Sequence, residues 1–389
     1  MSIASALKTG DLDRLPSRRD EDWRWTDLRG LIRVAPEPSP PLTNVVQPGG
    51  PFRAALGDEV VIANGRLNWW PDEPSQKGVQ IFEYDSPDPP RGVEGAAMAH
   101  WAAALATDPP VTILELDGQD PTTIRLRWVS DANGTAHHGR LGIVIKQGAS
   151  ALLFESYEGK GGGYLANHLV EIFVEPGGRL ERLVALDDVS DAISVSTSIV
   201  ELLPGASFHQ TVLASGAKRQ RFETRVRHHG GGGSVQLDGA YVLAGQRHSD
   251  QTTLVDHLEP DGVTSQLTKG VVQDQARGVF QGRIVVAEGA DGADARMGHH
   301  ALILSDRAEV DAKPELEIWA DDVACAHGNT VGALDEDALF YARSRGIPEP
   351  EARALLVGAF LGEAADRIEH IQARELAHEW IAARLRGAA

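Results

Sequence analysis

The pattern of hydrophobic and polar positions divides the chain into a strand-rich middle and two flanks of different character. From about residue 111, short runs rich in Val, Ile, Leu and Thr are separated by Gly, Asp and Pro. Runs of this length, bounded by turn-forming residues, are typical of β-strands and leave little room for helices. The middle of the chain is therefore expected to be mainly β.

A weak internal repeat runs through this middle. Each unit places a Gly-containing turn before an alternating segment, as in KQGASALLFE from residue 146 and EPGGRLERLV from residue 175. The turn glycines are 29, 28 and 27 residues apart, at Gly148, Gly177, Gly205 and Gly232. Near-constant spacing of one unit favours a stacked solenoid, and strands within each unit make it a β-helix. A large β-sandwich with recurring hairpins is the alternative.

The N-terminal flank combines three expected elements. Residues 15–33 place apolar side chains among charged ones at helical spacing, which predicts a short amphipathic helix. The apolar side chains of this helix are Trp23, Trp25, Leu28 and Leu31. Residues 34–51 are rich in proline, which favours an extended linker. A strand is expected at 59–67.

The C-terminal flank is expected to be helical. Residues 334–350 carry Asp335 as a helix cap and Gly346 as a stop signal. A second helix is expected from Pro350, with apolar residues every three or four positions at Leu356, Phe360, Ala364, Ile368 and Ile371. This stripe either docks onto the chain's own β-domain or binds a partner protein. The chain is thus divided into an N-terminal region (1–95), a β-helix core (96–332) and a C-terminal helical region (333–389).

Composition narrows the class of function. The 389 residues include 56 acidic and 37 basic side chains, and the formal net charge of -19 opposes binding to nucleic acid. The start of the sequence has no secretory signal pattern, and no apolar stretch is long enough to span a membrane, so a cytoplasmic location is expected. A single cysteine excludes an internal disulfide.

Several familiar catalytic signatures are missing from the sequence. EGKGGG at 158–163 lacks the residues of a phosphate-binding Walker loop, so no nucleotide site of its own is expected. Eleven of the 14 histidines lie between residues 137 and 327, and most are expected to be structural. Asp187, Asp188, Asp321 and Asp322 fit turns better than the carboxylate pair of a polysaccharide-cleaving β-helix.

Cys325 and His327 form the sharper candidate site. In an extended segment, residues i and i+2 share a face, so the thiol and the imidazole point to the same side. Such ligands suit zinc, copper or an iron–sulfur cluster, yet these sites ordinarily need four ligands. The missing ligands would come from the dispersed histidines or from another chain. A buried structural cysteine beside a capping histidine is the simpler alternative.

Two segments resemble a known family. KPELEIWADDVACAHGNTVGALDEDALFYARSRGI (313–347) and RRDEDWRWTDL (18–28) are similar to the signatures of SufD-type proteins in the SufB/SufD family, which assemble iron–sulfur clusters. The resemblance continues weakly through 248–286. It implies a right-handed parallel β-helix core flanked by helical N- and C-terminal regions, in a subunit that is not itself an enzyme.

The same resemblance implies partners and roles for individual residues. His327 is expected to bind a transient iron–sulfur cluster at the interface with the SufB paralogue, and Cys325 occupies the accompanying cysteine position. The C-terminal helices, through Leu356, Phe360 and Ile368, are expected to dock the SufC ATPase. A homodimer is the alternative assembly without SufB.

Two departures from the family pattern stand out. Where related sequences often carry a polar segment rich in Gln and Asn, this chain has MGHHALILS (297–305), and no role is assigned to His299 or His300. With Cys325 as its only cysteine, the chain cannot be the principal sulfur-accepting scaffold, since persulfide chemistry needs further thiols. A polysaccharide-acting β-helix enzyme and a purely structural adaptor remain the alternative functions.

Overall fold

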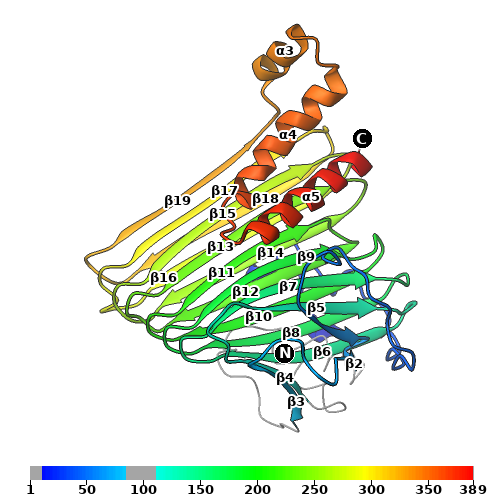
Figure 1. Cartoon of the computed structure of the whole chain (residues 1–389). Helices are drawn as coiled ribbons and strands as arrows, with labels where there is room; N and C mark the ends of the chain where they lie inside the picture. The colour runs from blue at the N-terminus through cyan, green and yellow to red at the C-terminus, as the bar shows by residue number, and fades with distance from the viewer. Residues whose placement is uncertain (1–10, 85–110, 389) are drawn as a thin grey trace.

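The computed structural model describes residues 11–84 and 111–388 and builds them into a parallel β-solenoid with C-terminal helices (Figure 1). Two sheets face each other. The ten-stranded sheet contains, in spatial order, β19 (Ala324–Gly332), β17 (Asp294–Ile303), β15 (Val263–Val272), β13 (Ser234–Leu243), β11 (Ser207–Ala214), β9 (Arg179–Asp187), β7 (Ser150–Gly159), β5 (Thr122–Ser130), β1 (Asp58–Ala63) and β2 (Arg66–Trp69). The nine-stranded sheet contains β18 (Glu309–Ile318), β16 (Arg277–Val286), β14 (His248–His257), β12 (Arg219–His228), β10 (Ile193–Leu202), β8 (Leu165–Val174), β6 (Ala136–Ile145), β4 (Val111–Leu116) and β3 (Val79–Tyr84).

The glycine repeat marks one corner of the solenoid, where each coil passes from the nine-stranded to the ten-stranded sheet. The four turn glycines have φ values of +69°, +68°, +72° and +77°, at Gly148, Gly177, Gly205 and Gly232. Glycine adopts this conformation without the steric penalty that a Cβ atom brings. Apart from the antiparallel pairs β1–β2 and β3–β4, neighbouring strands of each sheet pair in parallel, as β10 does with β8 and β12. This confirms the solenoid and excludes a sandwich of hairpins, whose neighbouring strands would be antiparallel.

The N-terminal segment differs from its expected helix. Between residues 11 and 33, only two short 3-10 helices form, η1 (Leu12–Arg14) and η2 (Glu21–Trp23). The apolar side chains instead pack as separate anchors on the outer face of the nine-stranded sheet, where Leu15, Trp23, Leu28 and Ile32 join Ala136, Leu165 and Val195. Asp20 and Asp27 fold the backbone into turns by accepting hydrogen bonds from the amides of Ser17 and Gly30, both at 2.8 Å. The prediction of an amphipathic helix was wrong because these contacts outweigh helical spacing.

Residues 34–57 are irregular apart from one bridge between Pro38 and Ala136. The single strand expected at 59–67 is instead the antiparallel hairpin of β1 and β2. Asn64 and Gly65 form its turn, with φ values of +46° and +80°. An Asn-Gly pair is the residue choice of a tight hairpin turn, so the sequence carried this signal.

The C-terminal region contains α3 (Glu336–Ser344), α4 (Glu349–Ala365) and α5 (Ile371–Ala388). Asp335 caps α3 as predicted, accepting hydrogen bonds from the amides of Asp337 and Ala338. The second expected helix is in fact two, because the chain turns at 366–370, between α4 and α5. Both helices lie across the outer face of the ten-stranded sheet, as Figure 1 shows. None of the helices in the described residues is long and apolar enough to cross a membrane.

Candidate functional site at the open end of the solenoid

The two ends of the solenoid are built differently. At the N-terminal end, the short antiparallel strands β2 and β3 close the two sheets. At the opposite end, β18 and β19 pair on one side only, with β16 and β17, and no described strand covers their outer edges. These strands are ten and nine residues long. Their free backbone donors and acceptors form a template for strands of another chain.

Cys325 and His327 both lie on β19 and face the interior of the solenoid at this open end. In the parallel register, Cys325 is beside Ala295 and His327 is beside Met297. Paired residues share a face of the sheet, and both Ala295 and Met297 are buried in the core between the sheets. The extended conformation expected for this segment is confirmed.

The two side chains are in different states. Cys325 is half-buried and packs against the core, and this burial raises the pKa of its thiol. His327 is exposed, and no hydrogen bond joins its imidazole to any residue that the structure describes. The imidazole is therefore the more available of the two donor groups.

The described residues of this chain do not form a metal site by themselves. No group of three or more His, Cys, Asp or Glu side chains that could hold a metal ion occurs within residues 11–84 and 111–388. Two donors at an open edge leave at least two ligand positions of a tetrahedral site to be filled.

His299 and His300, one strand further in, lie on opposite faces of β17. His299 is fully buried, and its Nδ1 is 2.7 Å from Oδ1 of Asn329. His300 faces outward, with its Nδ1 2.7 Å from Oγ1 of Thr330. The candidate site thus has two neighbours that the sequence did not single out, Asn329 and, behind His299, Tyr241.

Several other histidines and aspartates singled out in the sequence have structural partners. His228 stacks on His257 with ring centroids 5.3 Å apart, and both are buried. Asp187 accepts a hydrogen bond from the indole of Trp380 and pairs with Arg384, so it anchors α5. Asp187 and Asp188 line a cavity of about 410 Å³, but Asp188 is also engaged, since it accepts hydrogen bonds from Tyr164 and Gln220.

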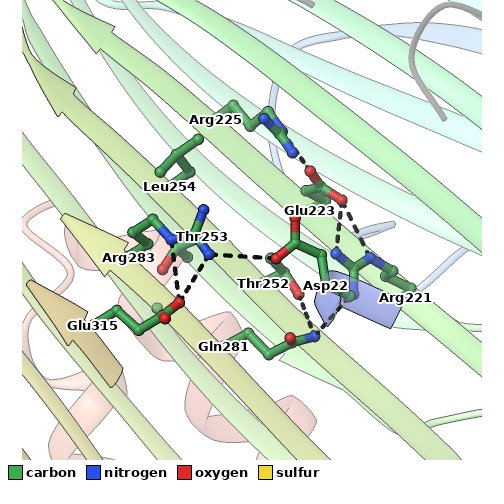
Figure 2. A pocket seen from close by; sticks show the side chains of 11 residues that line it. Asp22, Arg221, Glu223, Arg225, Thr252, Thr253, Leu254, Gln281, Arg283 and Glu315 are labelled. Atoms are coloured by element: carbon green, nitrogen blue, oxygen red, sulfur yellow. Dashed lines mark hydrogen bonds and ion pairs between the residues drawn. The ribbon is translucent and has the colours of Figure 1, made fainter. Parts of the chain in front are cut away.

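A small cavity of about 30 Å³ lies where the N-terminal segment crosses the nine-stranded sheet (Figure 2). Figure 2 shows its charged side chains joined in two groups of three: Arg221 and Arg225 with Glu223, and Arg283 with Glu315 and Asp22. A space of this size holds little more than a water molecule. We interpret this cavity as part of the anchor for the N-terminal segment.

The stripe expected to dock an ATPase lies against the chain's own sheet. Ile368 is 4% exposed in the apolar cluster that joins the helices to the ten-stranded sheet, and Leu356 and Phe360 are half-buried against it. The ammonium group of Lys269 is 4.4 Å from the ring centroid of Phe360. Of the stripe, Ile371 is exposed (69%), and the other large exposed apolar side chains of the helical region lie outside the stripe: Phe340 (71%), Tyr341 (60%) and Leu355 (56%).

Comparison with known proteins places this architecture in one family. The sequence model of the SUF system FeS cluster assembly SufBD core domain matches residues 128–360. An iron-sulfur cluster assembly SufBD family protein of Mycobacterium leprae is 30% identical over 94% of this chain and 89% of its own length. The iron-sulfur cluster assembly protein SufD of Escherichia coli is 27% identical over 94% of this chain and 87% of its own length. An iron-sulfur cluster assembly SufBD family protein of Synechocystis is 26% identical over 91% of this chain and 84% of its own length.

The matched residues include the coils of the solenoid, its open end and the start of the helical region. The resemblance expected from residues 313–347 and 18–28 is thereby confirmed. This chain belongs to the SufBD family of iron–sulfur cluster assembly proteins.

Proposed function

We propose that this protein is a non-catalytic subunit that helps to assemble iron–sulfur clusters at a junction with a SufB-type paralogue. The observation that carries the proposal is the open end, where His327 faces the interior between two unpaired edge strands. A second solenoid could continue both sheets across β18 and β19. Without the paralogue, the same edges would pair two copies of this chain.

In this arrangement, His327 is the ligand that this chain contributes to the nascent cluster. Its imidazole is accessible and has no competing hydrogen bond among the described residues. The remaining ligands would come from the partner, because the described part of this chain gathers no third donor. Cys325 is half-buried with a raised pKa, so its thiol lines the site in the neutral form unless the cluster draws off its proton.

The helical region is proposed to dock a SufC-type ATPase, which would supply the nucleotide hydrolysis. Leu356, Phe360 and Ile368 support this surface from beneath, since they fix α4 and the following turn on the ten-stranded sheet. The direct contact would be made by the exposed side chains Phe340, Tyr341 and Leu355. Phe340 and Tyr341 on α3 are exposed aromatic groups, which are typical anchors of a protein interface.

The test is the iron and acid-labile sulfide content of the complex co-expressed with SufB and SufC partners. His327→Ala is expected to lose most of both elements at unchanged subunit stoichiometry, because a ligand is removed from an exposed position that the fold does not need. His300→Ala, on the neighbouring strand but on the outer face, is the matched control and should retain them. Full cluster content in His327→Ala, with the ATPase still bound, would instead identify a purely structural adaptor.

A further inference from the structure

Asn329 lies on the same face of β19 as His327, two residues further along. In the register of the sheet, Asn329 is beside His299, whose side chain is buried in the interior. Residues i and i+2 of a strand are about 7 Å apart along the chain. The side chain of Asn329 is therefore positioned beside any group that binds to His327 at the open end.

The hydrogen bonds of His299 define the orientation of the Asn329 amide. His299 Nδ1 is 2.7 Å from Oδ1 of Asn329, and its Nε2 is 3.0 Å from the hydroxyl of Tyr241. An amide oxygen only accepts, so Nδ1 carries the proton. Nε2 then accepts from the Tyr241 hydroxyl, and the chain of donors runs from Tyr241 through His299 to Asn329.

The imidazole in the middle of this chain is held rigidly. Its ring stacks on Phe280 with centroids 4.7 Å apart and an interplanar angle of 3°, and Tyr241 stacks on it at 6.0 Å and 19°. His299 is 0% exposed. Burial lowers its pKa to about 4, which keeps the ring neutral and in one tautomer near neutral pH.

Since its oxygen is held by His299, the planar amide of Asn329 directs its NH2 group away from that ring. No described residue accepts a hydrogen bond from this nitrogen. Asn329 is exposed at the open end, so the NH2 group is available to a ligand there. A neutral amide is a poor metal ligand but a good donor to an anionic sulfur atom.

We propose that Asn329 is a further residue of the cluster site, and that its NH2 group donates a hydrogen bond to a sulfide or thiolate sulfur of the cluster beside His327. His299 acts as the positioning residue that orients this donor. Hydrogen bonds to sulfur stabilise its negative charge and raise the reduction potential of a cluster. This inference rests on the proposed function of the same open end.

The neighbouring pair His300 and Thr330 offers a matched control. It joins the same two strands one residue further along, at the same 2.7 Å, but on the outer face of the sheet. If the His–Asn pair merely held β19 against β17, the loss of either pair would have the same effect. A donor to the cluster would make the His299–Asn329 pair alone matter.

The experiment uses the complex co-expressed with its SufB and SufC partners, in wild type and in Asn329→Asp, Asn329→Ala, His299→Phe, His300→Phe and His327→Ala variants. Iron and sulfide per complex are measured together with the midpoint potential of the bound cluster. Asn329→Asp, which replaces the donor by an acceptor of the same shape, should lower the potential and reduce cluster content at least twofold. Asn329→Ala and His299→Phe should lower the midpoint potential and the cluster content by smaller amounts. His300→Phe should match wild type in both quantities.

Each other outcome separates the two claims. Loss of cluster in His327→Ala with wild-type potential and content in both Asn329 variants would overturn the role of Asn329 and leave the proposed function intact. Equal changes in His299→Phe and His300→Phe would mean that the His299–Asn329 pair only holds β19 against β17, and would overturn the role of Asn329 as a donor to the cluster. An unchanged cluster in His327→Ala would contradict the proposed function itself. If His299→Phe fails to fold, the exposed Asn329 variants still decide the question.

Discussion

Arg182 and Glu155 form an ion pair inside the solenoid, with Arg182 Nε donating to Glu155 Oε2 at 2.7 Å and both side chains fully shielded from solvent. Arg182 also donates to Ser198 and Gln210, each at 2.8 Å. The pair thus connects three coils and reaches across to the opposite sheet. A buried charge of this kind is tolerated only while its partners remain in place.

Replacing Arg182 with Met should therefore destabilise the protein by about 3–5 kcal/mol, because Glu155 would be left as an uncompensated buried charge. The double variant with Glu155→Leu should recover part of this loss. Recovery cannot be complete, since Trp128 and Tyr157 also donate to Glu155 and would lose their acceptor. Urea unfolding monitored by circular dichroism measures both variants.

Arg179→Met on the same strand is the control. Its side chain is 44% exposed and pairs with Glu369 at the surface, so its loss should cost at most about 1 kcal/mol. Equal destabilisation by the two arginine substitutions would show that the buried pair has no special importance.

Alanine substitutions at two glycines should change the free energy of unfolding in opposite directions. Gly177 has φ +68° in a turn of the repeat, and a Cβ there would meet no atom within 4 Å, so only backbone strain opposes alanine, at about 1–2 kcal/mol. Gly358 lies within α4, where a Cβ would touch Leu385 at an ordinary 3.7 Å. Gly358→Ala should stabilise by about 0.5–1 kcal/mol. Melting temperatures that move in the same direction would contradict this account of the repeat.

Substitutions of exposed and of buried apolar residues in the helical region should have different effects, the first on docking of the proposed ATPase partner and the second on folding. Phe340→Ser removes a side chain that is 71% exposed, so the melting temperature should stay unchanged while co-purification of the ATPase is lost. Ile368→Ala removes methyl groups from the buried cluster and should destabilise by about 2–5 kcal/mol. Retention of the ATPase by the Phe340 variant would place the docking surface elsewhere.

Features of the fold that depend on residues close together in the sequence could be predicted, and features that depend on contacts between distant residues could not. The turn glycines such as Gly177 and the cap at Asp335 are local, and both were found. The N-terminal segment was wrongly predicted to be a helix, because its conformation depends on distant contacts such as that of Trp23 with the guanidinium group of Arg221, about 200 positions away in the chain. The turn between α4 and α5 is likewise held by distant groups, with Asp238 binding Arg367.

The candidate site divides in the same way. Cys325 and His327 are two residues apart, so their spacing made them a candidate pair, and the family resemblance then assigned His327 its expected role. His299 and Asn329 are 30 residues apart and meet only because one coil of the solenoid separates them. Without the register of β17 and β19, nothing distinguished His299, which faces inward, from His300, which faces out.

Acid should destabilise the protein through its buried histidines. Burial lowers the pKa of His257 to about 4 where it contacts His228 and Thr264, and lowers that of His248 to about 4 as well. In the unfolded chain, histidine binds a proton near pH 6.5, so between pH 6.5 and 4 the unfolded state holds more protons than the native state. The free energy of unfolding is therefore highest above pH 6.5 and decreases as the pH falls through this window.

His257→Gln removes one of these groups and should make the decrease shallower, by up to about 1.4 kcal/mol per pH unit within the window. Urea unfolding of wild type and variant at several pH values between 7.5 and 4.5 gives the two slopes. A variant curve parallel to that of the wild type would mean that His257 keeps its unfolded proton affinity in the native protein, and that its stacked contact with His228 can accommodate the charge.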